Sequence, residues 1–502
     1  MTSRLLLQGT TATLLATACA VAFTAAAAPP RPIPLKVAEM RAADLRLDGS
    51  DAAAEARDAR TVAVRTPDAA FIKIHFANFS LPKGVTLEVS SPDGREVYRY
   101  SKDKLGPHTV DASLGQNGRT SFGAMSIQGP VALLRLVGTA REPWRAGQGV
   151  RVTRYMEGFP EAMLPELQHK QMLQQAGGSP EAICGTDDKE RAVCYADSDP
   201  TAFDRSRPVG RILMGSGSLC TAWRVGPDNR VFTNNHCTST QNGVAASEVW
   251  FNYQHTNCTG SGNAPVTKVA GDQLLATQAI LDYTLFTVED FATISSFGYL
   301  GLDVDEPTLN QEIFIAGNPG GRPKELSVVS DVDGGGHCLI SDPDYDGNGN
   351  NTDAAYSCDT EGGSSGSPVI ARDTNHAIAL HHFGNCPTNS GAKFSLIWPQ
   401  VSAHFGGVVP DGDDGGGGNT PPSAGFTSAA TRLVVRFTDA SSDSDGSIAS
   451  RSWDFGDGTS SSATNPIHRY AAPGRYTVTL TVTDDDGATG TTSQSIIVRR
   501  RP

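Results

Sequence analysis

Positive charge and long apolar runs are both scarce in this chain. Lys and Arg number 41 against 54 Asp and Glu, which gives a formal net charge of -13 over 502 residues. We expect no nucleic-acid partner, because phosphate binding depends on clustered basic side chains. Beyond the N-terminus no apolar run is long enough to cross a bilayer, so we expect no membrane span. The length exceeds what one hydrophobic core holds, which indicates several domains.

The cysteines lack the spacing of a zinc site, because no Cys-x-x-Cys pair or His-x-x-x-His spacing occurs among them. Cys19 falls in a predicted secretion signal over residues 1–28, where Arg4 precedes the mostly apolar stretch 5–22 and alanines at 25–28 offer a cleavage site. The other cysteines are even in number, which suits disulfides in an oxidising compartment. We therefore expect a secreted, extracellular protein.

Three separate segments supply a serine, a histidine and an aspartate. Ser365 lies in GGSSGSP (362–368), His236 in TNNHC (233–237) and Asp282 in the apolar stretch 279–286. A serine hydroxyl is a poor nucleophile, so acyl transfer needs an imidazole to take its proton and a carboxylate to orient the imidazole. The order His, Asp, Ser is that of chymotrypsin-like barrels and differs from the orders of subtilisins and α/β-hydrolases. The pattern predicts peptide-bond hydrolysis on an all-β double barrel.

The surroundings of these residues favour the same roles. A glycine two positions before the nucleophile lets its amide turn inward, so the amides of Gly363 and Ser365 are the expected oxyanion donors. The stretch 279–286 is predicted as a strand, where Asp282 needs a partner such as His236. One alternative is an inactive protease-like scaffold that acts as an extracellular adhesion or binding protein. Another is an esterase, although Ser365 lacks the Gly-x-Ser-x-Gly elbow.

Residues 180–500 resemble secreted bacterial serine endopeptidases of the trypsin-like (chymotrypsin-fold) family, lysyl endopeptidases in particular. The likeness rests on residues 233–237, on WFNYQ at 250–254, on TEGGSSGSP at 360–368 and on ALH at 379–381. It implies that His236 is the general base, Asp282 its orienting carboxylate and Ser365 the nucleophile acting on polypeptide substrates. It implies no cofactor for the chemistry. It also suggests disulfides from Cys220 to Cys237, Cys184 to Cys386 and Cys194 to Cys258, which leaves Cys338 with Cys358.

The residue preferred before the scissile bond is left open. Gly391 stands where lysyl endopeptidases carry an Asp, while Asp359 falls where trypsins place the acid at the floor of the pocket. An inward Asp359 favours Lys or Arg in the substrate. Thr360, His381 and the run SGAKF at 390–394 resemble glutamyl endopeptidases instead. We assign Asp359, Thr360, His381 and Gly391 to the substrate pocket and expect cleavage after basic residues, with a glutamyl-specific endopeptidase as the alternative.

Residues 342–353 have the spacing of a calcium loop. Oxygen donors stand at loop positions 1, 3, 5, 9 and 12 with glycine at position 6, which resembles an EF-hand loop. Against this, position 12 is Asp rather than Glu, no flanking helices are evident, and acidic Gly/Asn-rich stretches are commonly solvated turns. We expect a structural calcium ion that steadies the pocket, with these ligands: Asp342, Asp344, Asp346, Asn350 and Asp353.

Residues 29–180 are predicted to form a β-rich propeptide. Strand signals at 71–76, 85–89 and 97–100 are followed by a helical stretch at about 161–175. A permanent accessory domain is the alternative. We expect a cut between Lys170 and Ile183 to unblock the site. Ser364 stands where animal trypsins carry the Asp that pairs with the new N-terminus, so we expect activation without that ion pair.

The protease domain is predicted over residues 181–405, a flexible Gly/Asp-rich linker over 406–420 and a second β-domain over 421–500. In the last, strand signals at 432–437, 450–453 and 476–483 predict a small β-sandwich. WDFGDG (453–458) and GRYTVTL (474–480) resemble the polycystic-kidney-disease (PKD) repeat, an immunoglobulin-like module. The resemblance implies a module that holds an enzyme on an insoluble polymer or matrix protein, or a spacer.

Overall fold

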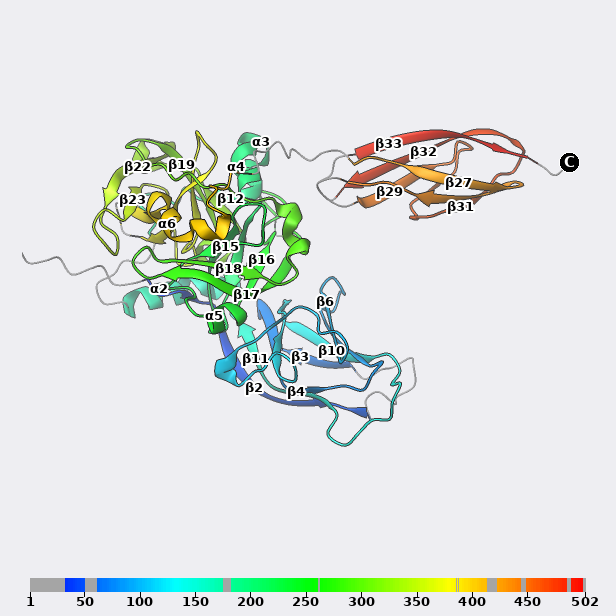
Figure 1. The fold of residues 1–502 in the computed structure, drawn as a ribbon, viewed down its shortest axis with the longest axis horizontal. Coiled ribbons are helices and arrows are strands. Elements are labelled where there is room, and N and C mark those ends of the chain that lie inside the picture. The colour runs from blue at the N-terminus through cyan, green and yellow to red at the C-terminus, as the bar shows by residue number, and fades with distance from the viewer. Residues whose placement is uncertain are drawn as a thin grey trace, which may run out of the picture.

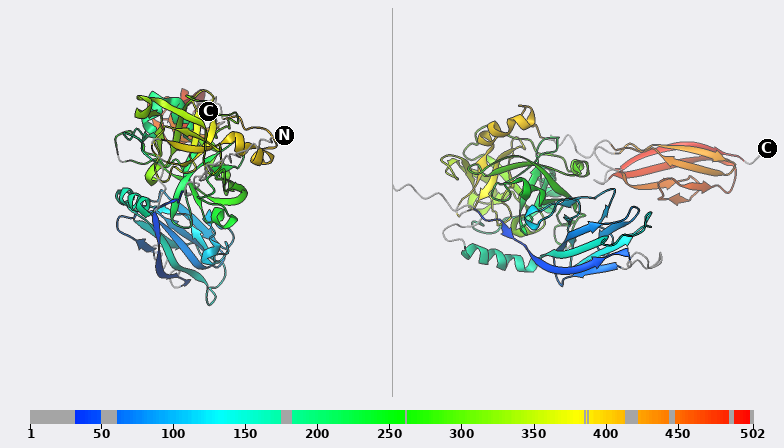
Figure 2. Two further views of the ribbon diagram at one scale, coloured as in Figure 1. Left: turned by 90° about the vertical axis from the view of Figure 1, so that its left-hand side faces the viewer. Right: turned by 60° about the horizontal axis from the view of Figure 1, so that its bottom comes forward.

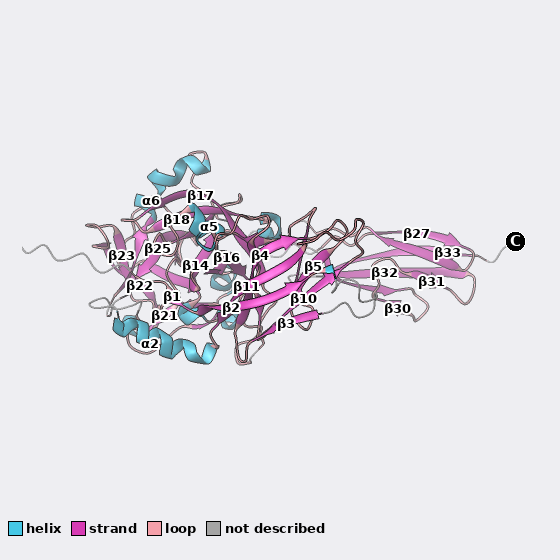
Figure 3. Ribbon diagram, turned by 90° about the horizontal axis from the view of Figure 1, so that it is seen from below, coloured by secondary structure: helices cyan, strands magenta, loops and turns pink. Residues whose placement is uncertain are grey.

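Strands dominate the chain, and the few helices are short. The computed structural model describes residues 32–49, 61–174, 182–260, 262–384, 386, 388–412, 422–443, 448–484 and 489–499. Figure 1 shows an N-terminal domain in blue and cyan, a central domain in green and yellow and a C-terminal sandwich in orange and red, and Figure 3 shows their strands in magenta. The all-β fold is confirmed. The predicted signal, the joint at 177–178 and most of the predicted linker lie outside the described residues.

The N-terminal domain is a β-sandwich with its own core. Side chains along β10 alternate, with Leu134 and Leu136 buried and Arg135 exposed, as a half-buried strand requires. The sheets run β3-β10-β5-β6 and β2-β11-β4-β8-β7, with β9 on β4. The strands are β2 (Ala38–Leu47), β3 (Thr61–Arg65), β4 (Phe71–Ser80), β5 (Thr86–Ser90), β6 (Val97–Ser101), β7 (His108–Thr109), β8 (Phe122–Ala124), β9 (Ile127–Gln128), β10 (Val131–Val137) and β11 (Gly149–Gly158). The expected β-rich segment is thus a folded sandwich.

Short helices occur within this domain and after its last strand. The 3-10 helix η1 spans Ala112–Leu114, and η2 (Glu161–Met163) runs directly into α2 (Leu164–Gln174), close to the helix expected at 161–175. Leu164 at the start of α2 is buried.

No helix among the described residues combines the length and the apolar character needed to cross a bilayer.

Two closed six-stranded barrels make up the central domain. The first runs β14-β13-β16-β17-β18-β15 and closes through the β14–β15 pair. Its strands are β13 (Val209–Leu213), β14 (Ser218–Arg224), β15 (Val231–Thr233), β16 (Glu248–Phe251), β17 (Thr267–Gln278) and β18 (Tyr283–Val288), with α5 (Gln241–Ala245) and η4 (Phe291–Phe297) outside. It is preceded by β12 (Glu190–Arg191), η3 (Ala192–Cys194), α3 (Tyr195–Ser198) and α4 (Pro200–Arg205).

The second barrel runs β19-β24-β25-β26-β23-β22 and closes through β19–β22, with β20, β12 and β21 extending the sheet. Its elements are β19 (Glu312–Gly317), η5 (Pro319–Gly321), β20 (Glu325–Ser327), β21 (Val329–Ser330), η6 (Asp331–Asp333), β22 (Gly336–Tyr345), β23 (Asp353–Tyr356), β24 (Pro368–Ala371), β25 (Ala377–Phe383), β26 (Asn389–Lys393), α6 (Phe394–Val401) and η7 (Ser402–Phe405). Phe394 packs 5.8 Å from Trp223 and 5.3 Å from Phe232, ring centroid to ring centroid. These rings join the two barrels into one core.

One strand on the first barrel comes from the N-terminal domain. β1 (Leu35–Lys36) pairs antiparallel with β14, placing Leu35 opposite Leu219. The next two amides, of Val37 and Ala38, both donate to the Gly217 carbonyl at 2.9 Å. Figure 2 shows the blue chain leading from the barrel into the N-terminal sandwich. The sequence did not predict this shared strand.

The C-terminal sandwich has one sheet of order β27-β28-β31 and another of order β30-β29-β32-β33. The strands are β27 (Phe426–Thr431), β28 (Val434–Asp439), β29 (Ile448–Asp454), β30 (Ser460–Ser461), β31 (Ile467–Arg469), β32 (Gly474–Asp484) and β33 (Thr489–Val498). Trp453 is fully buried against Phe426 and Phe437, and its indole N–H donates to the Ala463 carbonyl at 2.9 Å. The predicted small β-sandwich is confirmed.

The start of the predicted linker packs on the second barrel. The Leu302 amide donates to the Pro410 carbonyl at 3.0 Å, and the Gly412 amide donates to His376 Nε2 at 3.1 Å. Pro410 and Gly412, which fall in the predicted linker, therefore contact the second barrel through their backbone groups.

Candidate active site

The first barrel brings His236 and Asp282 together. His236 follows β15, Asp282 immediately precedes β18, and these strands pair with Thr233 opposite Thr284. Nδ1 of His236 lies 2.6 Å from Asp282 Oδ2, and the His236 amide donates to Oδ1 at 2.8 Å. Both side chains are 4% exposed. This geometry fixes the orientation of the imidazole.

Asp282 does not lie within a strand as the sequence predicted. The strand begins one residue later, and Asp282 has a φ of 45°, a left-handed conformation that Asp tolerates better than most residues. The Asn234 side-chain amide and the Asn235 backbone amide donate to its carbonyl at 2.8 and 3.1 Å. The tight turn delivers the carboxylate to His236, and the alternating apolar residues around it hid the turn.

The electrostatics of the pair suit a general base. Burial disfavours the charge on Asp282, but the adjacent His236 and His382 rings hold the pKa of this carboxyl below its usual range. Asp282 is therefore ionised at neutral pH. Nε2 of His236 is buried and has no hydrogen-bond partner within the described part of the chain. With Nδ1 committed to Asp282, Nε2 is the atom left to accept a proton.

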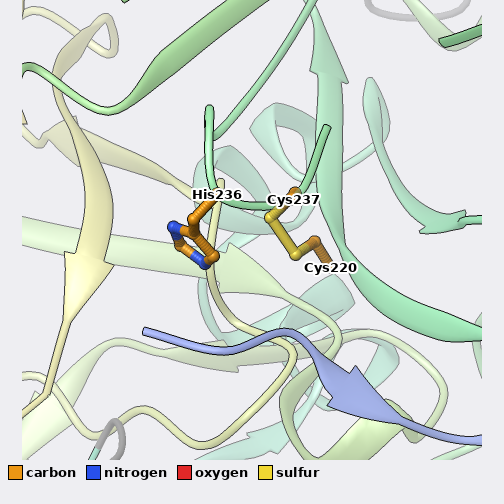
Figure 4. A group of neighbouring side chains, drawn as sticks. All are labelled: Cys220, His236 and Cys237. Atoms are coloured by element: carbon orange, nitrogen blue, oxygen red, sulfur yellow. A yellow bond between two sulfur atoms is a disulfide. The ribbon is translucent and has the colours of Figure 1, made fainter. Parts of the chain in front are cut away.

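A disulfide fixes the loop that carries His236. Cys237 is bonded to Cys220 on β14, and Figure 4 shows the imidazole beside this bridge, with the blue N-terminal chain passing nearby. Cys220, Cys237 and His236 form a group close enough to bind a metal ion. Since both sulfurs are consumed in the disulfide, we assign no metal to the group. The other bridges join Cys184 with Cys386, Cys194 with Cys258 and Cys338 with Cys358, the pairs that the resemblance suggested.

Ser365 comes from the second barrel, three positions before β24 begins at Pro368. Its carbonyl accepts from the Thr221 amide on β14 at 2.8 Å, and the Thr221 hydroxyl donates to the Gly363 carbonyl at 2.9 Å. The loop is thus tied to the strand that carries Cys220. Gly363 has a φ of 106°, and a Cβ there would lie 2.7 Å from the Asn318 carbonyl oxygen. Only glycine fits, as an inward-turned oxyanion amide requires.

His382 forms a second contact to the candidate triad that the sequence analysis missed. It lies fully buried on β25, with Nδ1 3.2 Å from Asp282 Oδ2 and Nε2 2.6 Å from Asp353 Oδ2. Burial opposes its charge, but Asp353 and Asp282 raise the pKa of His382 to about 10. The ring is therefore a cation at neutral pH. The signal available in the sequence was the doublet His381-His382 beside the family-like ALH.

Both carboxylate oxygens of Asp359, the residue expected at the floor of the pocket, accept hydrogen bonds from the backbone. Its oxygens accept the backbone amides of Cys184 and Asp188, each at 2.9 Å. Asp359 is 2% exposed, and burial raises its pKa despite these amides. The carboxylate anchors the first residues of the central domain. The trypsin position thus holds an acid with a different task.

The other assigned pocket residues lie close together. Gly391 on β26 pairs with His381 on β25, and Thr360 follows Asp359. Nδ1 of His381 lies 2.6 Å from the Tyr356 hydroxyl, and burial, together with the nearby His382 and His236, lowers the pKa of His381 to about 3. The Thr360 hydroxyl is buried without a hydrogen-bond partner among the described residues. The Gly366 amide, next to Ser365, donates to the His381 carbonyl at 2.9 Å, so His381 and its partner Gly391 lie beside the Ser365 loop.

The structure does not bring the acidic residues of the expected calcium site together. Residues 342–353 form the end of β22, a turn and the start of β23. No three acidic side chains of this stretch, all of it described, lie close enough to share an ion. Asp353 is fully buried and accepts from Ser390 and Thr352 in addition to His382. The hydroxyls and the imidazole satisfy Asp353, so the expected five ligands do not converge.

The N-terminal domain covers the His236 side of the site. A cavity of about 580 Å³ is lined by residues of both domains, including Lys36, Met40 and Arg154 from the N-terminal domain and Ser216 and His236 from the barrel. Two buried contacts hold the N-terminal domain against the first barrel. Glu248 on β16 lies 2.8 Å from Lys73 Nζ, and Lys268 on β17 lies 2.5 Å from Glu96 and 2.7 Å from the Ser126 carbonyl.

Known proteins match two parts of the chain. Residues 186–390 match the family described as lysyl endopeptidase, C-terminal domain, and residues 419–498 match the PKD domain family. The chain therefore contains a chymotrypsin-fold protease domain of the lysyl endopeptidase type followed by a PKD domain.

Curated relatives match different parts of the chain. It is 29% identical over 341 residues to the secreted RxLR effector protein 73 of Plasmopara viticola, covering 65% of this chain and 78% of that one. It is 47% identical over 77 residues to the pre-pro-metalloprotease PrtV of Vibrio cholerae, covering 15% of this chain and spanning 8% of that protein's length.

Two solved structures are also similar to parts of the chain. A Glu endopeptidase in complex with MPD is 17% identical with a TM-score of 0.33, covering 45% of this chain and 100% of that chain. The PKD1 domain of Vibrio anguillarum Epp is 43% identical with a TM-score of 0.16, covering 16% of this chain and 99% of that chain.

Proposed function

We propose that the protein is a secreted serine endopeptidase made as a precursor. Ser365 attacks the peptide carbonyl, His236 takes the hydroxyl proton through Nε2, and Asp282 supports the resulting imidazolium. The amides of Gly363 and Ser365 donate to the oxyanion, and the acyl-enzyme is then hydrolysed. The observation that carries the proposal is the buried 2.6 Å contact of His236 with Asp282, on the barrel edge to which the Ser365 loop is tied.

The N-terminal domain is proposed to be an inhibitory propeptide. β1 lies on the edge of β14, next to the disulfide that carries His236, and so occupies a surface that an extended peptide needs. A cut between Lys170 and Ile183 separates the domain from the protease. Ser364 carries no charge, so we propose that the new amine forms no ion pair at that position.

The substrate preference requires a choice between two classes. A preference for basic residues relied on Asp359, whose oxygens already accept two backbone amides. The buried Thr360 hydroxyl, which has no hydrogen-bond partner among the described residues, and the neighbouring His381 instead suit an acidic side chain. Glutamyl-type cleavage is therefore our second candidate. The PKD domain is proposed to hold the enzyme on an insoluble polymer or matrix protein.

Replacement of the nucleophile tests the function. We expect Ser365→Ala to lower peptide hydrolysis roughly 10³-fold or more, to the level left by binding and the oxyanion donors. An organophosphonate should label Ser365 in the processed protein. The matched control is Ser367→Ala, which removes a hydroxyl two residues away and should retain activity and labelling. Full activity in Ser365→Ala disproves the assignment.

The substrate class is tested with two peptides that differ only in a Lys or a Glu before one scissile bond. Faster hydrolysis of the Glu peptide supports the second candidate, whereas faster hydrolysis of the Lys peptide returns the preference to basic residues. An Asp359→Asn variant provides the control. If Asp359 only anchors residues 184–188, the variant should lose stability while the ratio between the two peptides stays unchanged.

A further inference from the structure

His382 is held from opposite sides by two carboxylates. Its two ring nitrogens contact Asp282 at 3.2 Å and Asp353 at 2.6 Å. A neutral imidazole has one N–H, whereas ionised carboxylates only accept hydrogen bonds. A doubly protonated ring satisfies both contacts. All three side chains are at most 4% exposed, so little water screens these charges.

Asp353 has no direct contact with the candidate triad in this network. It begins β23 in the second barrel, and its oxygens accept from His382, from the Ser390 hydroxyl at 2.7 Å and from the Thr352 hydroxyl at 2.9 Å. A buried carboxylate is costly unless such partners compensate for lost water. The positive charge on His382 compensates the buried negative charge of Asp353. An uncharged Asn at position 353 would need no such cation.

We propose that Asp353 is a positioning residue that acts on the catalytic triad through His382. It keeps the second ring nitrogen protonated and thereby fixes the first N–H on Asp282. Asp282 is then held between His382 on one side and His236 on the other. The inference rests on the proposed serine peptidase function of this same site.

The charges that face His382 give the expected effect its direction. Asp282 faces it from the first barrel, Asp353 faces it from β23, and His381 is its neighbour on β25. A cation at His382 offsets part of the negative charge of Asp282, which disfavours a proton on His236. When Asp353 is removed, His382 loses its proton and Asp282 supports a protonated His236 more strongly.

The test compares Asp353→Asn with Ser390→Ala in the processed enzyme. In Asp353→Asn we expect the acid limb of kcat/KM to move to higher pH by about one unit and kcat at neutral pH to fall about tenfold with little change in KM. Ser390→Ala removes a hydrogen bond from the same carboxylate without its charge and should keep the wild-type limb. A folded Asp353→Asn enzyme with the wild-type acid limb overturns the proposal.

A second measurement does not need activity. In the Ser365→Ala chain we expect two exchange-protected ring N–H proton signals from His382 in NMR spectra at pH 7, and a single signal at pH 7 would overturn the proposal. This readout remains available if Asp353→Asn does not fold. Wild type and Ser365→Ala, assayed together, report on the function itself. If wild type cleaves no peptide while both His382 signals are present, the proposed function fails and the buried charge network stands.

Discussion

The two β-sandwiches that flank the protease domain are attached differently. The N-terminal sandwich adds β1 to the first barrel and buries Lys73 against Glu248 on it. The strands of the PKD sandwich, orange and red in Figure 1, pair only with one another as far as the structure describes them. Both domains are antiparallel sheets around aromatic cores. The fold class therefore does not determine the role of such a domain, whereas the chemistry of its boundary with the protease does.

The N-terminal boundary is chemically specific. Lys73 Nζ and Glu248 are 2% and 0% exposed, and Glu248 also accepts from the Ser126 amide and the Trp250 indole. When the N-terminal domain leaves, Lys73 and Glu248 are both exposed to water, so neither stays behind as an unpaired buried charge. The pair costs free energy only if one member is missing while the other remains buried. Such a boundary suits a domain that binds tightly and then departs.

Separating the N-terminal domain should give the largest effect. We expect peptide hydrolysis to rise roughly 100-fold when the chain is cut between Lys170 and Ile183 and the domain is removed, since a linked inhibitor acts at an effective concentration in the millimolar range. Hydrolysis of a short peptide before and after controlled proteolysis measures it. Equal rates before and after removal would contradict an inhibitory role and favour a permanent accessory domain.

Lys73→Met should weaken the docking of the same domain. Loss of one partner from a buried ion pair costs about 3–5 kcal/mol, whereas the mature enzyme exposes Glu248 to water and is unaffected. The uncut variant should therefore show activity that the uncut wild type lacks. Arg135→Met is the matched control, because Arg135 pairs with Glu88 but is 51% exposed, and such a pair contributes about 0–1 kcal/mol. If neither uncut variant hydrolyses peptide, the ion pair does not contribute measurably to the docking of the N-terminal domain.

Acid should loosen the docking at Glu248. Burial opposes its charge, but Lys73 and Lys268 lower the pKa of Glu248 to about 2. Once the N-terminal domain is separated from the barrel, the pKa of Glu248 returns to about 4.3. A carboxyl whose pKa is depressed by docking stabilises the docked state fully above the free value, and the contribution is lost as pH falls from about 4.3 toward about 2. Fluorescence of the Ser365→Ala precursor should follow this range through Trp250, and Glu248→Gln should remove the pH dependence.

Deleting the PKD domain should give the smallest effect. A chain ending at Gly412 keeps the contacts of residues 406–412 with the second barrel, so hydrolysis of a short soluble peptide should stay within about twofold of the full enzyme. Activity on an insoluble protein substrate should fall. A large loss on the soluble peptide would show that the two flanking domains differ less than their boundaries indicate.

The sequence predicted the modules and the triad better than the relations between them. Alternation, turns and the family-like motifs around His236 and Ser365 are local signals. Asp282 was identified, but its left-handed turn was masked by apolar neighbours. The contacts of Asp353 and Asp359 were not predicted because their partners, His382 and the residues at 184–188, lie at least 29 positions away. Spacing shows where a carboxylate stands in the chain and not which donors it meets.

The anchoring of the protease N-terminus sets a demand on its maturation. Ala182 exchanges hydrogen bonds with Asn389, and its carbonyl also accepts the Thr360 amide. If the proposed maturation cut fell beyond Ala182, it would remove the residue that joins Asn389 to Thr360. Ragged processing upstream of Ala182 leaves the contact intact. The tolerance for cleavage errors is therefore one-sided, and N-terminal sequencing of the active and inactive fractions of a mature preparation should show it.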